Sequence, residues 1–487
     1  MTTENLISIY DFEIFPYALG DVLTWNIRSA IRCEETGSPF ADIYICLDEK
    51  HHASIYQRGL VNPDNFELFF SELYSAFGTH PKLGNFYIFR NRESMIAQLK
   101  KIAPKNKHNS EALRDYLTIL KYKASDRIFN KIWHYLKNKL GKQRILKKAY
   151  RYLVPNTLTK MTHNLLSHED VLNQYFIKYI YSHDKINQFY LNKNYIPFLK
   201  ESLGCNPDVN EIIARQFNGK KIVCIHLRLR KLDLGYGGEH TYTRDSDFLE
   251  WYDFLRQTSE KYPDIQFVAL GRLQEKPLEM LRLPNVISLR VHGMGLGHEL
   301  TLMLKSDLFI GTSSGFAALA NFSSIPYFIT RMNPESCNAY AIAQGENKLP
   351  FAKENQQLIY EEENAKLLMN LLETGLNLAP HSMQPKNNLV TEPQQIDITD
   401  WLTTHSKATY SARTTCRFYI DDNYRNNETT YLLLSSFEKC RQAFINNDYQ
   451  KARSILLKIK NNFPNLCQQC AEYLQLEANL AAVETYP

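Results

Sequence analysis

Short apolar runs alternate with amphipathic stretches in two separate parts of the chain. In the first part, Ile7–Phe15 and Asp42–Leu47 have the apolar, β-prone composition of strands and flank a helical stretch at Val22–Cys33. A further strand is predicted at Asn85–Phe89. Continuous apolar runs separated by helices are typical of parallel strands that are covered on both faces. The pattern therefore predicts a βαβ opening.

The second part begins near Lys220 and repeats this alternation almost without interruption. Its predicted strands are Lys221–Leu227, Gln266–Leu270, Val286–Leu289, Asp307–Gly311 and Pro326–Thr330. Its predicted helices are Asp245–Tyr262, His298–Lys305, Ser314–Phe322 and Leu358–Thr374. Such an alternation predicts a doubly wound parallel sheet. The fold class is therefore α/β, with two Rossmann-like domains facing a cleft.

The rest of the chain is predicted to be largely helical. We expect an N-terminal domain over residues 1–215 with a helical insertion over about 95–200, and a second domain over 216–376. A linker or irregular segment rich in Pro, Asn, Gln and Thr covers 377–428, and a helical tail covers 429–487. The tail resembles one tetratricopeptide helix pair at Ala443, Tyr449, Ala452, Leu456 and Pro464. We expect it to pack on the core, the alternative being a separate module that recruits a protein partner.

Length and composition fit two globular cores, since the 487 residues are 44% hydrophobic and 22% charged. The sequence has no apolar run long enough for a transmembrane helix, and its first residues do not resemble a secretory signal. The nine cysteines are scattered and suit a reducing compartment. Cys467 and Cys470 have metal-ligand spacing, but no second pair accompanies them, which favours buried cysteines over a zinc site. We expect a cytoplasmic protein.

Positive charge is concentrated in one segment. The net charge is only +5, yet Lys100–Lys160 contains 17 lysines and arginines and three acidic residues. A basic segment of this density indicates an anionic partner. One interpretation is an amphipathic surface, with Trp133 at its boundary, that lies on the anionic inner face of a membrane. The other is a solvated helical insertion. No nucleic-acid-binding module is recognisable, so no nucleic acid is expected as a partner.

The strongest chemical motif lies at Asp307–Pro326, with the sequence DLFIGTSSGFAALANFSSIP. A buried strand ends at Gly311, and the small residues Thr312, Ser313, Ser314 and Gly315 open the next helix. Hydroxyls and free backbone N–H groups at such a turn favour a diphosphate, and small residues let it approach closely. The alternative is an ordinary strand-to-helix turn in which a serine is the N-cap.

A second motif, His226-Leu-Arg228-Leu-Arg230, ends the first strand of the same sheet. Ligands bind at the carboxyl edge of such sheets, where a guanidinium can pair bidentately with a pyrophosphate. The alternative is a structural histidine followed by surface arginines. Glu299 follows the glycine-rich loop Gly293–Gly297 of the same region. No D-x-D motif is found in a suitable loop, so a metal-dependent mechanism is not indicated and no metal ligand is assigned.

The third motif is Gly20-Asp21, which follows the first strand. A carboxylate at this turn could accept a proton from an acceptor hydroxyl, and Asp21 is our candidate catalytic base. The alternative is that Asp21 is a helix N-cap.

Together these motifs resemble glycosyltransferases of the two-domain GT-B type. The run containing Asp307, Ile310, Gly311, Ser314, Gly315, Leu319, Ala320 and Pro326 is similar to the donor motif of the bacterial heptosyltransferase family. Gly20-Asp21 is similar to the element of that family that carries the base. His226-x-Arg228 resembles the H-x-R motif of the fucosyltransferase superfamily, whose arginine holds the donor diphosphate. Heptosyltransferases have an acid at the position of Ser313 and a histidine at that of Ala318, and this difference favours fucosyltransferase-like serines.

The resemblance implies an enzyme that moves a sugar from a nucleotide-diphosphate donor, with GDP-fucose favoured, to a glycan, a lipid-linked acceptor or a protein. It implies donor binding by His226, Arg228, Arg230, Glu299, Asp307 and Thr312–Gly315. No separate cofactor is expected, because the nucleotide sugar is itself a substrate. Two alternatives stay open: a non-catalytic Rossmann scaffold that recruits a partner through the tail, and a nucleotide-sugar epimerase.

Overall fold

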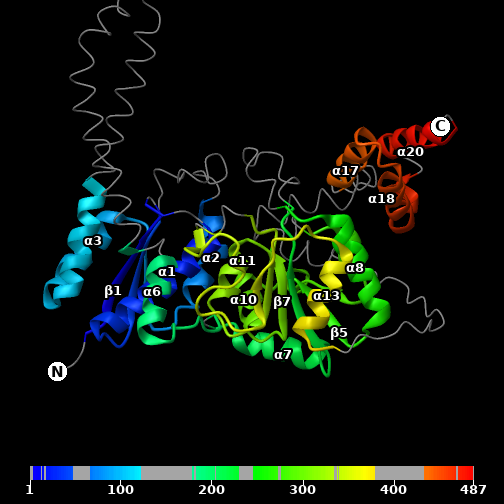
Figure 1. Ribbon diagram of the computed structural model, residues 1–487. Helices are drawn as coiled ribbons and strands as arrows, with labels where there is room; N and C mark the ends of the chain where they lie inside the picture. Colours follow the sequence, from blue (N-terminus) through cyan, green and yellow to red (C-terminus); the bar gives the residue numbers. More distant parts are fainter. Residues whose placement is uncertain are drawn as a thin grey trace, which may run out of the picture. The chain divides into compact units, whose positions relative to one another are not determined.

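The computed structural model describes residues 4–12, 14–15, 18–47, 66–121, 178–179, 183–202, 204–229, 245–272, 276–333, 337, 339–378, 433–467 and 470–485. They form two compact units that are each assembled from separated parts of the chain (Figure 1). Unit 1 comprises Met1–Pro16, Thr24–Tyr56 and His80–Pro197. Unit 2 comprises Tyr17–Leu23, Gln57–Thr79 and Phe198–Pro487. Both units carry a parallel sheet, which confirms the predicted α/β class.

Unit 1 contains a parallel sheet in the order β1-β2-β3, formed by Leu6–Asp11, Ala41–Cys46 and Leu83–Phe89. Its helices are α3 (Arg92–Ile102) and α6 (His183–Lys193), with a short η2 at Ala103–Lys105. Helix α1 (Leu19–Thr36) begins in unit 2 and continues in unit 1. Strand β1 is buried along its whole length, as its apolar sequence predicts. The predicted βαβ opening is therefore confirmed.

Unit 2 contains a parallel sheet in the order β6-β5-β4-β7-β8-β9. Its strands are β4 (Lys221–His226), β5 (Ile265–Ala269), β6 (Val286–Ile287), β7 (Leu308–Thr312), β8 (Tyr327–Thr330) and β9 (Gln356–Leu358). Its helices before the tail are α2 (Phe66–Phe77), α7 (Asn206–Gln216), α8 (Phe248–Lys261), α9 (Leu278–Leu281), η6 (Leu289–His292), α10 (Leu296–Leu304), α11 (Gly315–Asn321) and α13 (Ala365–Gly375). Helices α10 and α11 lie on one side of β7, and α8 and α13 lie on the other (Figure 1).

One prediction in this sheet is wrong. The last helix was expected over Leu358–Thr374, but residues Gln356–Leu358 form β9, which pairs with β8. The helix starts only at Ala365, because the side chain of Asn364 caps it by accepting a hydrogen bond from the backbone N–H of Leu367 at 2.8 Å.

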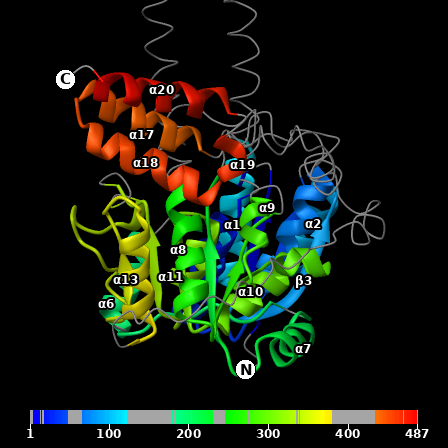
Figure 2. The ribbon, with the colours of Figure 1, turned by 90° about the vertical axis from the view of Figure 1, so that its right-hand side faces the viewer.

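The C-terminal tail forms α17 (Leu434–Ile445), α18 (Tyr449–Asn462), α19 (Pro464–Cys467) and α20 (Ala471–Thr485). Helices α17, α18 and α20 pack against one another (Figure 2). Their apolar faces share one core with α8, in which the ring of Phe463 lies 4.9 Å from that of Tyr252 and 6.0 Å from that of Phe248. The prediction that the tail packs on the core is confirmed.

Parts of several predictions lie outside the described residues. They include the basic segment beyond residue 121 and the linker from 379 onward. Within the part of the chain that is described, no helix is both long and apolar enough to cross a membrane.

Candidate functional site

The second sheet brings the predicted phosphate-binding motifs to one edge. In its register His226 of β4 is the partner of Gly311 in β7, and Thr312 is the partner of Thr330 in β8. Because all six strands are parallel, the residues that follow β4, β7 and β8 emerge at the same carboxyl edge. Ligands of doubly wound sheets bind at this edge.

Arg228 is a buried cation at this edge. Its side chain is 6% exposed, and its Nε lies 3.6 Å from Oδ1 of Asp245, which is 5% exposed. Two hydrogen bonds fix its backbone: its N–H donates to Oγ of Ser246 at 3.2 Å, and its carbonyl accepts from the N–H of Ser246 at 2.8 Å. The buried His226 ring lies 4.9 Å from that of Phe316. Arg230 lies outside the described residues.

Two hydroxyls at the end of β7, the strand next to β4, are enclosed and lack a partner among the described residues. Thr312 is fully buried at the end of β7, and Ser314 precedes α11 without capping it through its side chain. Within the described part of the chain neither Thr312 Oγ1 nor Ser314 Oγ has a hydrogen-bond partner. Between them, the backbone N–H of Ser313 donates to the carbonyl of Thr330 at 3.2 Å. Buried polar atoms are nearly always paired, so an unpaired group indicates a ligand or ordered water.

Gly315 and Gly20 bring the first and third sequence motifs into contact within unit 2. A Cβ built on Gly315 would lie 2.7 Å from Cβ of Leu19 and 3.2 Å from the backbone nitrogen of Gly20. A Cβ on Gly20 would lie 3.5 Å from Cα of Gly315 and 3.9 Å from Cβ of Ala318. Because Gly315 has no side chain, the first residues of α1 can pack directly against its backbone. The small side chain of Ala318 lies beside the same contact.

Asp21 follows this glycine contact and lies half-buried in the first turn of α1. The helix begins at Leu19, three residues before Val22, where a cap at Asp21 would have it begin. Asp21 is thus the third residue of the helix and not its N-cap. A carboxylate in the first turn is still favoured by the helix dipole.

The structure does not bring Asp307 to the carboxyl edge, so its assignment to the donor site is wrong. Asp307 precedes β7, at the opposite edge of the sheet from Thr312. Its Oδ2 accepts from the N–H of Ile222 at 2.8 Å, and its Oδ1 pairs with Nζ of Lys221 at 3.0 Å. These contacts hold the amino ends of β4 and β7 together.

Glu299 is fully buried in α10, and both of its carboxylate oxygens already contact cations of the protein. Its Oε1 lies 3.2 Å from Nζ of Lys276 and accepts from the N–H of Gly271 at 3.2 Å. Its Oε2 lies 3.0 Å from Nη2 of Arg290. Gly271 follows β5, so this network lies at the carboxyl edge but serves to hold it together. Its role in donor binding stays a prediction.

Sequence reasoning missed a buried carboxylate beside β8. Glu363 accepts a hydrogen bond from Oγ1 of Thr330 at 2.6 Å and another from the N–H of Asp247 at 3.0 Å. Burial raises the pKa of Glu363 above its ordinary value, and the contacts with Thr330, Arg331 and Asp247 only partly oppose this. Arg331 follows β8 with φ of 56°, a left-handed conformation that is uncommon for a residue other than glycine. The acidic run before Asn364 was the only signal for Glu363, and it did not indicate burial.

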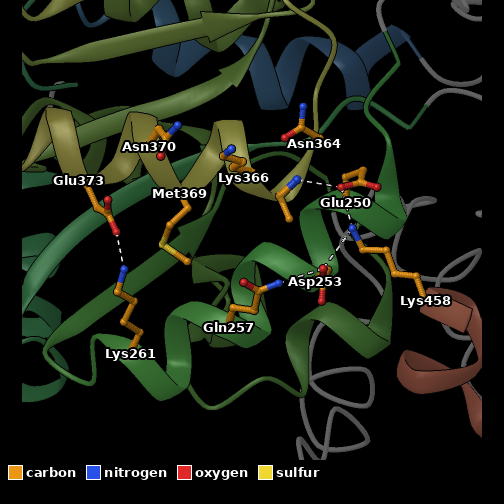
Figure 3. A pocket seen from close by; sticks show the side chains of 11 residues that line it. Glu250, Asp253, Gln257, Lys261, Asn364, Lys366, Met369, Asn370, Glu373 and Lys458 are labelled. Atoms are coloured by element: carbon orange, nitrogen blue, oxygen red, sulfur yellow. Dashed lines mark hydrogen bonds and ion pairs between the residues drawn. The ribbon is translucent and has the colours of Figure 1, made fainter. Parts of the chain in front are cut away.

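A groove of about 490 Å³ lies elsewhere, between α8 and α13 (Figure 3). Its acids are already paired with lysines. Glu373 lies 2.6 Å from Nζ of Lys261, while Lys458 of the tail reaches Glu250 at 2.8 Å and Asp253 at 3.0 Å. The groove is therefore where the tail attaches to α8, and its lining does not include Arg228, Thr312 or Ser314.

Comparisons with known proteins give only distant similarities. No known protein family matches the sequence, and no curated protein matches it either. The chain is similar to the solved structure of ADP-heptose LPS heptosyltransferase II from E. coli, with 12% identity, 77% of this chain and 99% of that chain covered, and a TM-score of 0.41. A family 9 glycosyltransferase from Veillonella parvula has 11% identity over 78% of this chain and 99% of its own, with a TM-score of 0.36.

A third similar structure is a protein described as a UDP-N-acetylglucosamine 2-epimerase from Listeria monocytogenes. It has 9% identity over 84% of this chain and 96% of its own, with a TM-score of 0.31. Similarities at this distance do not assign a reaction to this chain.

Proposed function

We propose that this protein is a glycosyltransferase that binds a nucleotide-diphosphate sugar at the carboxyl edge of the second sheet. The observation that carries the proposal is the combination of buried Arg228 with the enclosed, unpaired hydroxyls of Thr312 and Ser314. A guanidinium and two hydroxyl donors are the groups that a diphosphate accepts hydrogen bonds from. The cost of enclosing the two hydroxyls without a partner among the described residues is removed when the ligand binds.

We further propose Asp21 as the base that deprotonates the acceptor hydroxyl. The support is its place directly after Gly20, which packs against Gly315 beside the enclosed serine. The sequence resemblance to fucosyltransferases favours GDP-fucose as the donor, and a glycan, a lipid-linked acceptor or a protein as the acceptor. We propose that charge on the leaving diphosphate is stabilised by Arg228 and the hydroxyls.

Replacing Arg228 tests the donor site directly. Arg228→Ala removes a charge-assisted hydrogen bond worth about 1.5–3 kcal/mol, so the affinity for the nucleotide should fall about ten- to hundredfold. Calorimetric titration with GDP, then UDP and ADP, measures this, with melting temperatures recorded in parallel. Arg215→Ala is the control, because Arg215 lies on α7 with its side chain 76% exposed and pairs with the exposed Glu211 one helical turn away.

The proposal fails if none of these nucleotides binds the unmodified protein, or if Arg228→Ala binds them equally well. Binding without release of nucleotide from any nucleotide sugar would favour a non-catalytic scaffold. Conversion of the donor sugar in the absence of an acceptor would favour an epimerase.

A further inference from the structure

Two lysines of the C-terminal tail reach the beginning of α8. Lys439 on α17 places its Nζ 2.7 Å from Oδ2 of Asp247 and 2.7 Å from Oε1 of Glu362. Lys458 on α18 lies 2.8 Å from Oε2 of Glu250 and 3.0 Å from Oδ2 of Asp253 (Figure 3). The tail therefore binds the first turns of α8 with cations as well as with its apolar face.

The carboxylate that Lys439 contacts is tied to the rest of the site. Asp247 is the N-cap of α8, and its side chain is only 5% exposed. Its N–H donates to Glu363, while the residue before it, Ser246, shares two hydrogen bonds with the backbone of Arg228. Asp245, the next residue back, forms the ion pair with the Arg228 guanidinium. A short stretch of three residues thus connects Lys439 to Arg228.

The raised pKa of Lys439 is consistent with its ion pairs with Asp247 and Glu362. Burial works to lower the pKa of Lys439, but Asp247 and Glu362 more than offset it, so the pKa lies above its ordinary value and the lysine stays charged. A buried carboxylate that loses its cation is strongly disfavoured. Asp247, which caps α8 through Oδ1, therefore depends on the tail for the cation that contacts its Oδ2.

We infer that the C-terminal helices are part of the donor site, and that Lys439 is a positioning residue that holds Arg228 in its binding orientation through the Asp245–Asp247 segment. This inference rests on the proposed function, since it assigns a role to Arg228 in binding a nucleoside diphosphate. It gives the tail a function inside the enzyme and needs no protein partner.

The test is a double-mutant cycle in the full-length protein. Lys439→Met should weaken GDP binding about two- to thirtyfold, the range of coupling effects transmitted through a few residues. In the Arg228→Ala background the same change should have no further effect, because the residue through which it acts is absent. Lys439→Arg keeps the cation and should restore binding. Lys460→Met is the matched control, because Lys460 pairs with Glu477 inside the tail at a surface-exposed site.

Hydrogen exchange gives a readout that does not depend on nucleotide. In Lys439→Met the amides of residues 245–255 should exchange faster than in Lys460→Met, while those of β1 and β2 should be unchanged. Equal exchange in the two variants overturns the inference. So does unchanged GDP affinity in Lys439→Met, or an equal loss of affinity with and without Arg228. If the unmodified protein binds no nucleotide, the proposed function fails, and the positioning role falls with it even where exchange changes.

Discussion

The two sheets place a charged residue at the carboxyl end of their first strand, but they treat it differently. In unit 1, Asp11 ends β1 and is fully buried; it accepts from Nε of Arg92 at 2.6 Å, Nη2 of Arg92 at 2.8 Å and the hydroxyl of Tyr116 at 2.6 Å. In unit 2, Arg228 follows β4, and its ion pair with Asp245 spans 3.6 Å, longer than a hydrogen bond.

Under the proposed function, this difference separates a structural network in unit 1 from the donor site in unit 2. The bidentate pair at Asp11 satisfies both carboxylate oxygens, and burial together with Asp11 raises the pKa of Tyr116 above its ordinary value. A network of this kind stabilises the fold and offers little to a ligand. The edge of unit 2 keeps hydroxyls unpaired among its described residues, which is the state expected of a site that a ligand completes.

The largest expected effect is on catalysis at the edge of unit 2. Asp21→Asn should lower turnover about 10²–10⁴-fold, because general base catalysis typically contributes this much. GDP affinity should stay nearly unchanged, and the melting temperature should change little because Asp21 is not the N-cap. Release of nucleotide from the nucleotide sugar, calorimetry and thermal melts measure the three quantities. Glu35→Gln, an exposed acid on the same helix, is the control. Full activity in Asp21→Asn would exclude Asp21 as the base.

The next effect should appear only in stability. Asp11→Ala leaves Arg92 and Tyr116 without their shared acceptor, and breaking a buried pair in this way costs about 3–5 kcal/mol. Urea unfolding should show this loss, whereas nucleotide affinity at a temperature where the variant is folded should not change. A marked loss of affinity in folded Asp11→Ala would contradict the division between a structural edge and a binding edge.

At Thr312 we expect a smaller effect, on nucleotide affinity and not on stability. Thr312→Val removes an enclosed hydroxyl that has no partner in the described residues, so the free protein should be no less stable than the unmodified one. Nucleotide binding should weaken by about 0.5–1.5 kcal/mol, or about two- to twelvefold. Calorimetry and thermal melts of the same samples give both values. A destabilised variant with unchanged affinity would mean that the hydroxyl serves the fold.

The smallest effect concerns the pH dependence of stability. The pKa of Glu363 is raised by burial, so the folded state binds a proton more tightly than the unfolded state, and this contribution is lost as pH rises above the ordinary value of about 4.3. Glu363→Gln removes the titration and keeps one of the two acceptor oxygens, and the loss of the other lowers stability equally at both pH values. Between pH 5 and pH 8 the unmodified protein should therefore lose stability relative to the variant. Urea unfolding at both pH values would refute this if the two proteins changed in parallel.

The sequence predicted the strands of unit 2 well because strands buried on both faces are continuous apolar runs. It missed β9, whose three residues include two glutamines. The meeting of Arg228 and Thr312 at one edge was predictable, since both follow strands of the same parallel sheet. The error at Asp307 was avoidable on the same ground, because a residue before a strand lies at the other edge. The partners Asp245 and Glu363 were not predictable, since tertiary packing alone decides which distant acids become buried beside Arg228 and Thr330.

The assembly of unit 2 from three separated segments has a consequence for any dissection or recombination of the gene. A fragment that began at Phe198 would contain the whole second sheet but lack both Gly20, which packs on Gly315, and Glu72, whose Oε2 lies 3.2 Å from Nε of Arg272. Unit 2 therefore cannot be exchanged between proteins as one continuous segment. A functional chimera must take the start of α1, helix α2 and the C-terminal part from the same parent protein. Because segments of unit 1 lie between these three parts of the chain, the two units are expected to be inherited together.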